Sequence, residues 1–203
     1  MKNFNEKEEN IIQVIRLRKV ILLVDNGSKH LNNIINFLRK KNALIVKVDP
    51  LKFNLRKLKK EVINGVILSG GNTLRFFQKK EFNFSVIRLF RKKPLLGICL
   101  GHEFLIDFYG GGLYKMSWRA QGLSYIHITK DNSLIRGRRN LLVYKGHSYA
   151  AGILPDCFEQ LAWSTDCENE MIEHRKYPHF GVQFHPEKTK DGHIILSNFL
   201  KLC

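Results

Sequence analysis

Cysteine and long apolar runs are both scarce in this sequence of 203 residues. Its four cysteines are too few for a disulfide framework in a chain of this length, and they lack the Cys-x-x-Cys spacing of a metal site. No apolar run approaches the roughly 20 residues that a membrane-spanning helix requires. Residues 1–10 are polar and of mixed charge, without the apolar core of a secretory signal. We therefore expect a cytoplasmic protein with reduced cysteines, no membrane contact, and no metal or cofactor.

Acidic residues are also few, 18 against 34 lysines and arginines, which gives a net charge of +16. Such an excess suits a protein that binds nucleic acid or an acidic protein partner. The basic residues are scattered, however, and no aromatic side chains alternate with them as a stacking surface for bases would require. The pattern therefore favours a solvated basic surface over an acidic partner, and an acidic partner over a nucleic acid.

Short apolar segments and helical patterns alternate in the first half of the chain. Strands are predicted at residues 20–25, 43–48, 65–68 and 95–98. Helices are predicted at residues 29–41, where leucine and isoleucine recur at helical spacing, and at residues 54–62. A β-α-β-α-β order of this kind predicts a parallel sheet with helices on both of its faces.

Beyond residue 110 the pattern changes to short segments of alternating polarity. Antiparallel strands are predicted at residues 123–129, 141–144, 161–164 and 171–174. The chain then returns to a strand at residues 180–185 and ends in an amphipathic helix over residues 192–202. The sequence thus predicts a doubly wound α/β fold, with a mostly parallel central sheet and a small antiparallel extension, as one domain over residues 19–203. Residues 1–18 are predicted to form an N-terminal tail or a short helix.

Cys99 follows the predicted strand at residues 95–98 and lies between two glycines, Gly97 and Gly101. This spacing is typical of a nucleophile at a tight strand-to-helix turn, where small neighbours let strand and helix approach closely. A helix that begins directly after the cysteine points backbone N–H groups at the sulfur, so we expect a lowered thiol pKa. The alternative interpretation is an ordinary tight turn, because glycine and cysteine also occur together in such turns.

A histidine near the end of the chain supplies the base that a cysteine nucleophile needs. His185 follows an apolar segment, and Glu187 stands two residues later, after Pro186. The base takes the proton of the thiol, and the carboxylate fixes the tautomer of the base. A lone histidine at a strand end is usually structural, but its pairing with Cys99 favours catalysis. We therefore predict that Cys99, His185 and Glu187 form a catalytic triad.

Residues 97–102 (Gly-Ile-Cys-Leu-Gly-His) and residues 181–187 (Gly-Val-Gln-Phe-His-Pro-Glu) together resemble the motifs of the class I (triad) glutamine amidotransferases. The resemblance covers nearly the whole sequence, from about Val20 to Leu202. It implies a flavodoxin-like domain that hydrolyses the side-chain amide of glutamine through a γ-glutamyl thioester on the cysteine. Glutamate and ammonia would be released, and the ammonia would pass to a synthase partner.

Two backbone N–H groups are expected to stabilise the oxyanion that acyl transfer develops. One belongs to Leu100, directly after the nucleophile. The resemblance implies that Gly71 provides the other, from a glycine loop that would otherwise be interpreted as a plain turn. The resemblance also implies four glutamine-binding residues, which are Gly70, Glu103, Ser148 and Tyr149. His147 is an alternative base, but we favour a structural or pocket role for it, because only His185 has a carboxylate at the right spacing.

Four departures from the pattern of the family leave the triad intact but bear on the pathway. Glu103 stands where glutamine is commonest, and Asn72 stands where proline is usual. Residues 146–149 (Gly-His-Ser-Tyr) and 188–191 (Lys-Thr-Lys-Asp) differ from the corresponding segments of the GMP synthase branch. These changes put the identity of the ammonia acceptor in doubt.

Within the family, Ser69-Gly70-Gly71 and residues 154–167 are most similar to the glutaminase subunit of GMP synthase. The sequence has no room for an ATP-pyrophosphatase domain, so we expect a free-standing glutaminase subunit whose partner is a separate synthase subunit. Three alternatives stay open. The chain could serve another pathway, of the anthranilate or aminodeoxychorismate type, act alone as a γ-glutamyl peptidase, or be an inactive regulatory relative.

Overall fold

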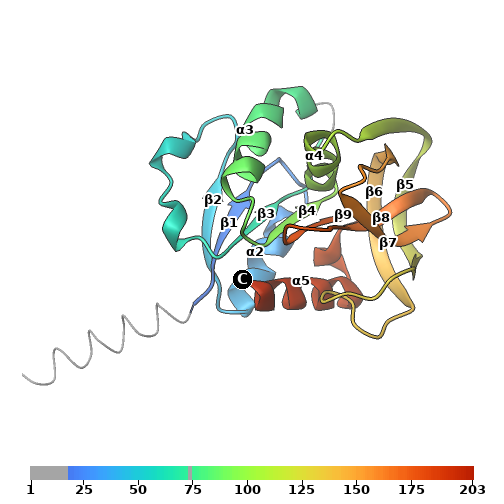
Figure 1. Ribbon diagram of the computed structural model, residues 1–203. Coiled ribbons are helices and arrows are strands. Elements are labelled where there is room, and N and C mark those ends of the chain that lie inside the picture. The colour runs from blue at the N-terminus through green and yellow to red at the C-terminus, as the bar shows by residue number, and fades with distance from the viewer. Residues whose placement is uncertain (1–17, 73–74) are drawn as a thin grey trace, which may run out of the picture.

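One mixed sheet runs through the molecule (Figure 1). The computed structural model describes residues 18–72 and 75–203, and the sheet has nine strands within those ranges. From one edge to the other they are β2 (Leu44–Val48), β1 (Val20–Val24), β3 (Gly65–Leu68), β4 (Leu95–Ile98), β9 (His179–Val182), β8 (Cys167–His174), β7 (Phe158–Ser164), β5 (Gly112–Ile128) and β6 (Asn140–Ile153). The pairings from β2 to β9 are parallel, and those from β9 to β6 are antiparallel.

Helices cover both faces of the parallel half of the sheet (Figure 1). They are α2 (Leu31–Lys40), α3 (Phe76–Leu89), α4 (Leu100–Phe108) and α5 (Lys190–Leu202). In β1, Ile21 and Leu23 belong to the core with α2 and α5, whereas Leu22 and Val24 belong to the core with α3 and α4. Because successive side chains of a strand point to opposite faces, a strand covered on both faces has to be apolar throughout.

The antiparallel half is built on two long strands, β5 with 17 residues and β6 with 14. On one face, Ile126 and Val143 enter the core that contains α5. On the other face of β5, Leu123 and Tyr125 are exposed. One face of this half is thus covered and the other solvated, which explains the alternating polarity of its sequence. The pairing of β5 with β6 is interrupted between Lys115 and Ala120, where the register shifts.

The predicted doubly wound α/β fold is confirmed, and the predicted strands of its parallel part agree with the structure to within a few residues. The predicted helix over residues 54–62 is wrong. That segment contains two short 3₁₀ turns, η1 (Leu55–Lys57) and η2 (Lys60–Val62), and none of their residues is buried. Only Leu55 and Leu58 pack against the core, and both are partly buried, so a helix of this length would gain too little to offset its nucleation.

Helix α3 was not expected from the sequence. Its buried residues recur at helical spacing, but they include Lys79 and Asn83, so the apolar pattern is interrupted. Both polar side chains bind Asn26 at the end of β1: Lys79 Nζ donates to the Asn26 carbonyl, and the Asn83 amide exchanges hydrogen bonds with the Asn26 amide. A helix with a polar patch inside its buried face gives a weak amphipathic signal.

The last strand is shorter than predicted. β9 ends at Val182, and the following residues bind other strands, with Gln183 N–H donating to Glu170 O and His185 N–H donating to Tyr144 O, both at 2.8 Å. Residues 1–17 of the predicted N-terminal tail lie outside the described residues. In the described part of the chain, no helix is long and apolar enough to cross a membrane.

Candidate active site

Cys99 lies at the turn between β4 and α4 with φ 51° and ψ −105°. A positive φ is uncommon for a residue with a side chain, and such strain persists only where the surroundings impose it. Here the Cys99 N–H donates to Val182 O at 2.8 Å, and the Cys99 carbonyl accepts from Glu103 N–H at 3.0 Å. The backbone is thus fixed from β9 on one side and from α4 on the other, and the cysteine side chain is buried.

The glycines that flank Cys99 are required by packing. A Cβ at Gly97 would overlap the carbonyl of Gly101, and a Cβ at Gly101 would overlap the carbonyl of Leu68 in β3. All of these obstacles are backbone atoms, which cannot move aside as a flexible side chain can. The two glycines therefore allow α4 to start directly against β3 and β4, which is the geometry expected of the tight strand-to-helix turn.

His185 and Glu187 meet at a second turn, beyond β9. His185 precedes the short turn η4 (Pro186–Lys188), in which Pro186 occupies a first-turn position. The His185 Nδ1 atom lies 2.9 Å from Glu187 Oε1, and both side chains are buried. With Nδ1 bound to the carboxylate, Nε2 is the ring nitrogen left to exchange a proton with a substrate or a nucleophile.

Gly70 is the point where the cysteine and the histidine come together. An ideal Cβ on Gly70 would lie 3.0 Å from His185 Cε1 and 3.4 Å from Cys99 Cβ. Two segments separated by more than 80 residues in the sequence therefore approach the same small space. The imidazole is further enclosed by the His30 ring, at 4.9 Å between centroids and in an edge-on orientation. Its position is consequently fixed by packing on several sides.

The thiol of Cys99 differs electrostatically from the sequence-based expectation. Burial raises the pKa of Cys99 well above its ordinary value, and the carboxylates of Glu103 and Glu187 raise it further. The Leu100 N–H and the Arg119 guanidinium lower it, but by less. The expected lowering of the thiol pKa is therefore wrong, because the loss of hydration outweighs the helix N-terminus. A thiol of this kind needs a base beside it before it can act as a nucleophile.

Gly71 lies directly beside Leu100. An ideal Cβ on Gly71 would lie 2.9 Å from Leu100 Cδ2 and would overlap the Asn26 carbonyl. Asn26 fixes the glycine loop at residues 69–71 through two hydrogen bonds. Its backbone N–H donates to Ser69 Oγ at 2.9 Å, and its side-chain amide donates to Ser69 O at 3.1 Å. The polar residues of α3 that bind Asn26 therefore also support the glycine loop.

The predicted glutamine-binding residues come from the loop after β3, from α4 and from β6. Glu103 is buried on α4 and accepts from Gln183 Nε2 at 3.2 Å. Ser148 and Tyr149 lie on β6, shortly after Gly146, which packs against the His185 ring. The described contacts bring Gly70 and Glu103 close to the nucleophile, whereas Ser148 and Tyr149 are linked to it only through this part of β6.

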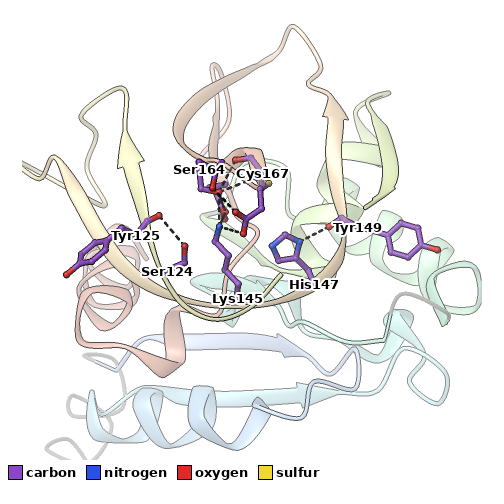
Figure 2. Close-up of polar contacts among 10 residues, drawn as sticks. Ser124, Tyr125, Lys145, His147, Tyr149, Ser164 and Cys167 are labelled. Carbon is purple, nitrogen blue, oxygen red and sulfur yellow. Dashed lines mark hydrogen bonds and ion pairs between the residues drawn. The ribbon is translucent and has the colours of Figure 1, made fainter. Parts of the chain in front are cut away.

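His147 occupies a structural environment. Its Nδ1 atom lies 2.9 Å from Tyr149 O, which is a backbone carbonyl rather than a carboxylate. Burial lowers the pKa of His147 to about 4, which keeps the ring neutral at physiological pH. Figure 2 places its imidazole on the same strand as Lys145, on the side that faces Ser164 and Cys167. His147 thus lacks the carboxylate partner that His185 has, and His185 as the base stays a prediction.

A buried ion pair next to the site was not predicted. Lys145 Nζ lies 2.7 Å from Glu170 Oε1 and 3.0 Å from Asp166 Oδ2, and both Lys145 and Glu170 are almost fully buried. Ser164 Oγ joins the group: it accepts from Lys145 Nζ at 2.7 Å (Figure 2) and donates to Glu170 Oε1 at 2.7 Å. Although burial acts to lower it, the two carboxylates raise the pKa of Lys145. The sequence signal was a lone lysine on the buried face of an alternating strand.

Arg119 was also missed, since one arginine among 34 basic residues carries no pattern of its own. Its Nη2 atom donates to Gly146 O at 3.0 Å. In the part of the chain that the structure describes, no group of three or more histidine, cysteine or acidic residues has the geometry to hold a metal ion.

Comparison with known proteins places the chain in a family. The family model for "Glutamine amidotransferase class-I" matches residues 22–202. This chain is a class I glutamine amidotransferase. A relative from Methanococcus maripaludis, named as a glutamine-hydrolysing GMP synthase subunit, is 34% identical over 188 residues, covering 91% of this chain and 97% of the relative. A relative of the same name from Pyrococcus furiosus is 34% identical over 187 residues, covering 91% and 98%.

Solved structures of amidotransferases have the same fold. A structure described as that of a GMP synthase subunit from Thermoplasma acidophilum matches with a TM-score of 0.82 and 26% identity, covering 92% of this chain and 94% of that one. A glutamine amidotransferase from Thermotoga maritima matches with a TM-score of 0.70 and 22% identity, covering 91% and 81%. The second likeness concerns the fold alone.

Proposed function

We propose that this amidotransferase is the glutaminase subunit of a GMP synthase, with Cys99 as nucleophile, His185 as base and Glu187 as the group that orients the base. The observation that carries the proposal is the meeting of Cys99 and His185 at Gly70, with Nδ1 of the imidazole bound to the buried carboxylate of Glu187. This is the arrangement that acyl transfer through a thioester requires.

The first half of the reaction forms a bond between the Cys99 sulfur and the γ-carbonyl carbon of glutamine. Because burial keeps the thiol protonated, His185 Nε2 takes the proton as the sulfur attacks. Negative charge then develops on the former amide oxygen, where the N–H groups of Leu100 and Gly71 act as donors. The tetrahedral intermediate collapses as His185 returns the proton to the leaving nitrogen, and ammonia departs.

The second half hydrolyses the γ-glutamyl thioester. His185 removes a proton from water, the water oxygen attacks the same carbonyl carbon, and the Cys99 sulfur leaves with the proton that His185 returns. Glu187 stabilises the imidazolium formed in each half by its hydrogen bond to Nδ1. The products are glutamate and ammonia, and the thiol is restored.

Four residues are assigned to recognition of glutamine. Gly70 lies between the nucleophile and the base, where a side chain would occupy the space of the substrate. Glu103 supplies negative charge for the α-ammonium group. Ser148 and Tyr149 contribute from β6, on which Gly146 packs against the His185 ring.

A separate synthase subunit of the ATP-pyrophosphatase type receives the ammonia. Two observations support this partner and this pathway. The relatives at 32–34% identity are named as the glutamine-hydrolysing subunit of GMP synthase, and this chain covers 97% of their length. The relatives thus correspond to the glutaminase unit alone.

Labelling by a glutamine-analogue electrophile, such as 6-diazo-5-oxo-norleucine, tests the site. Peptide mass spectrometry should find the adduct on Cys99, and the protein should release glutamate and ammonia from glutamine. Cys99→Ala should abolish both, whereas the matched control Cys157→Ala, at a half-buried cysteine outside the site, should retain both. Labelling that persists in Cys99→Ala would contradict the assignment of the nucleophile.

Assays with alternative substrates and partners test the pathway. Faster hydrolysis of γ-glutamyl peptides than of glutamine would identify a γ-glutamyl peptidase instead. Ammonia transfer should be followed as conversion of xanthosine monophosphate to GMP in the presence of ATP and a synthetase subunit of GMP synthase. Glutamine-dependent GMP formation that requires this chain supports the proposed pathway, and its absence with an active glutaminase would assign another acceptor.

A further inference from the structure

Arg119 lies where β5 leaves its regular pairing with β6. The register is interrupted between Lys115 and Ala120, and pairing resumes at Ala120 opposite His147. Interruptions of this kind change the direction of nearby side chains and are common beside active sites. The Arg119 guanidinium extends from β5 to the neighbouring strand β6, where Nη2 donates to Gly146 O at 3.0 Å.

Gly146 connects that guanidinium with the predicted base. An ideal Cβ on Gly146 would lie 3.6 Å from His185 Nε2 and 3.9 Å from Arg119 Nη2. One arginine N–H group and the free nitrogen of the base therefore border the same position on β6. Arg119 is otherwise exposed, so its remaining donors are accessible to solvent and to a ligand.

Arg119 is a positive charge near Cys99, where the other charged side chains are carboxylates. Glu103 and Glu187 both act on the thiol as negative charges, and Arg119 acts on it as a positive charge. An anion that enters the site would be repelled by the two carboxylates unless a cation were present. The amide of glutamine is neutral, so the anionic part of the substrate that needs such a cation is the α-carboxylate.

We propose that Arg119 is a specificity-determining residue that binds the α-carboxylate of glutamine. The proposal rests on the proposed glutaminase activity. A guanidinium presents paired N–H donors that match the two oxygens of a carboxylate, and the Gly146 carbonyl holds it beside the base. Glu103 on α4 acts on Cys99 with the opposite sign, so the site then offers one charge of each sign to a zwitterionic substrate.

Two substrates and two arginine variants test this role. Ammonia release is measured from glutamine and from glutamine α-methyl ester, which keeps the γ-amide but lacks the α-carboxylate charge. Arg119→Met removes the cation, and Arg119→Lys keeps the charge without the paired donors. Arg136→Met is the matched control, because Arg136 is an exposed arginine in the turn between β5 and β6.

With the native protein, KM should be about 10- to 100-fold higher for the ester than for glutamine, as expected for the loss of a charge-assisted hydrogen bond. Arg119→Met should raise KM for glutamine by a similar factor, change kcat less, and leave KM for the ester nearly unaltered. Arg119→Lys should lie between the native protein and Arg119→Met, and Arg136→Met should match the native protein.

Two results would overturn the proposal. One is a native protein that hydrolyses glutamine and its ester with the same KM, an outcome that needs no variant and so does not depend on folding. The other is an Arg119→Met variant that loses kcat/KM equally for both substrates, which would limit Arg119 to tuning Cys99 or supporting β6. Failure of the native protein to hydrolyse either substrate would instead contradict the proposed glutaminase activity.

Discussion

The two halves of the sheet handle polar groups in opposite ways. In the parallel half, from β2 to β9, strands such as β1 are buried and apolar, and the reactive groups lie just beyond the strand ends. In the antiparallel half, from β8 to β6, polar groups lie within the strands themselves, as the buried pair of Lys145 and Glu170 does.

This difference separates reactivity from recognition. Cys99 and Gly71 follow parallel strands, where backbone N–H groups and a helix start can be directed at one atom. Gly146 and Arg119 belong to antiparallel strands, whose exposed face and irregular pairing let side chains reach over the site. Substitutions in the first half should therefore affect chemistry, and substitutions in the second should affect stability or substrate affinity.

The largest effect is expected at His185. His185→Ala should lower kcat by about 10⁴-fold or more, because the buried thiol then loses the base that takes its proton. Glu187→Gln should have a smaller effect and lower kcat by about 10²- to 10³-fold. The amide oxygen of glutamine can still bind His185 Nδ1, but the negative charge of the carboxylate is lost. Steady-state kinetics checks both, and circular dichroism should report a native fold for each variant. An unchanged kcat in Glu187→Gln would contradict the assignment of Glu187 as the third member of the triad.

The next effect should appear in the antiparallel half, as a loss of stability rather than of chemistry. Lys145→Met leaves the buried carboxylate of Glu170 without its cation and should lower the free energy of unfolding by about 3–5 kcal/mol. Urea denaturation measures the change. The double variant Lys145→Met/Glu170→Gln should recover most of the loss, because it removes the unpaired charge as well. If Lys145→Met had the same free energy of unfolding as the native protein, the buried ion pair would not stabilise the antiparallel half, and this contrast between the halves would fail.

The last effect should be common to both halves and is a dependence of stability on pH, which is the smallest of the three when counted per pH unit. Burial lowers the pKa of His102 to about 3 and that of His147 to about 4, against an ordinary value of 6.5. Between pH 6.5 and about 4 the unfolded chain therefore binds more protons than the folded one. Stability should fall as pH falls through this range, by about 1.4 kcal/mol per pH unit for each histidine.

Variants of the two histidines measure how much of this pH dependence comes from each half. His102→Asn, on α4, and His147→Asn, on β6, should each reduce the slope of unfolding free energy against pH between 6.5 and 4 by a similar amount. Urea unfolding at half-unit pH steps gives the slopes. A slope that neither substitution alters would mean that other groups set the acid sensitivity of the protein.

Much of the parallel half could be predicted because its strands are local signals. An apolar run such as β1 and a Gly-x-Cys-x-Gly spacing each depend on a few adjacent residues. Helix α3 could not be found in this way, because Lys79 and Asn83 interrupt its apolar face in order to bind Asn26. The helix predicted over residues 54–62 failed for the converse reason, since its residues have helical propensity but only Leu55 and Leu58 pack, partly buried, against the core.

The sequence by itself determined the class of the fold, the positions of Cys99 and His185, and the glycines that the turn at Cys99 requires. Only the tertiary structure decided the electrostatics of the thiol and the nearness of Arg119 to the base. The physical reason is that a motif fixes which groups are present and how the backbone bends beside them. Hydration and long-range charge depend instead on every segment that packs around the site, and those segments come from distant parts of the chain.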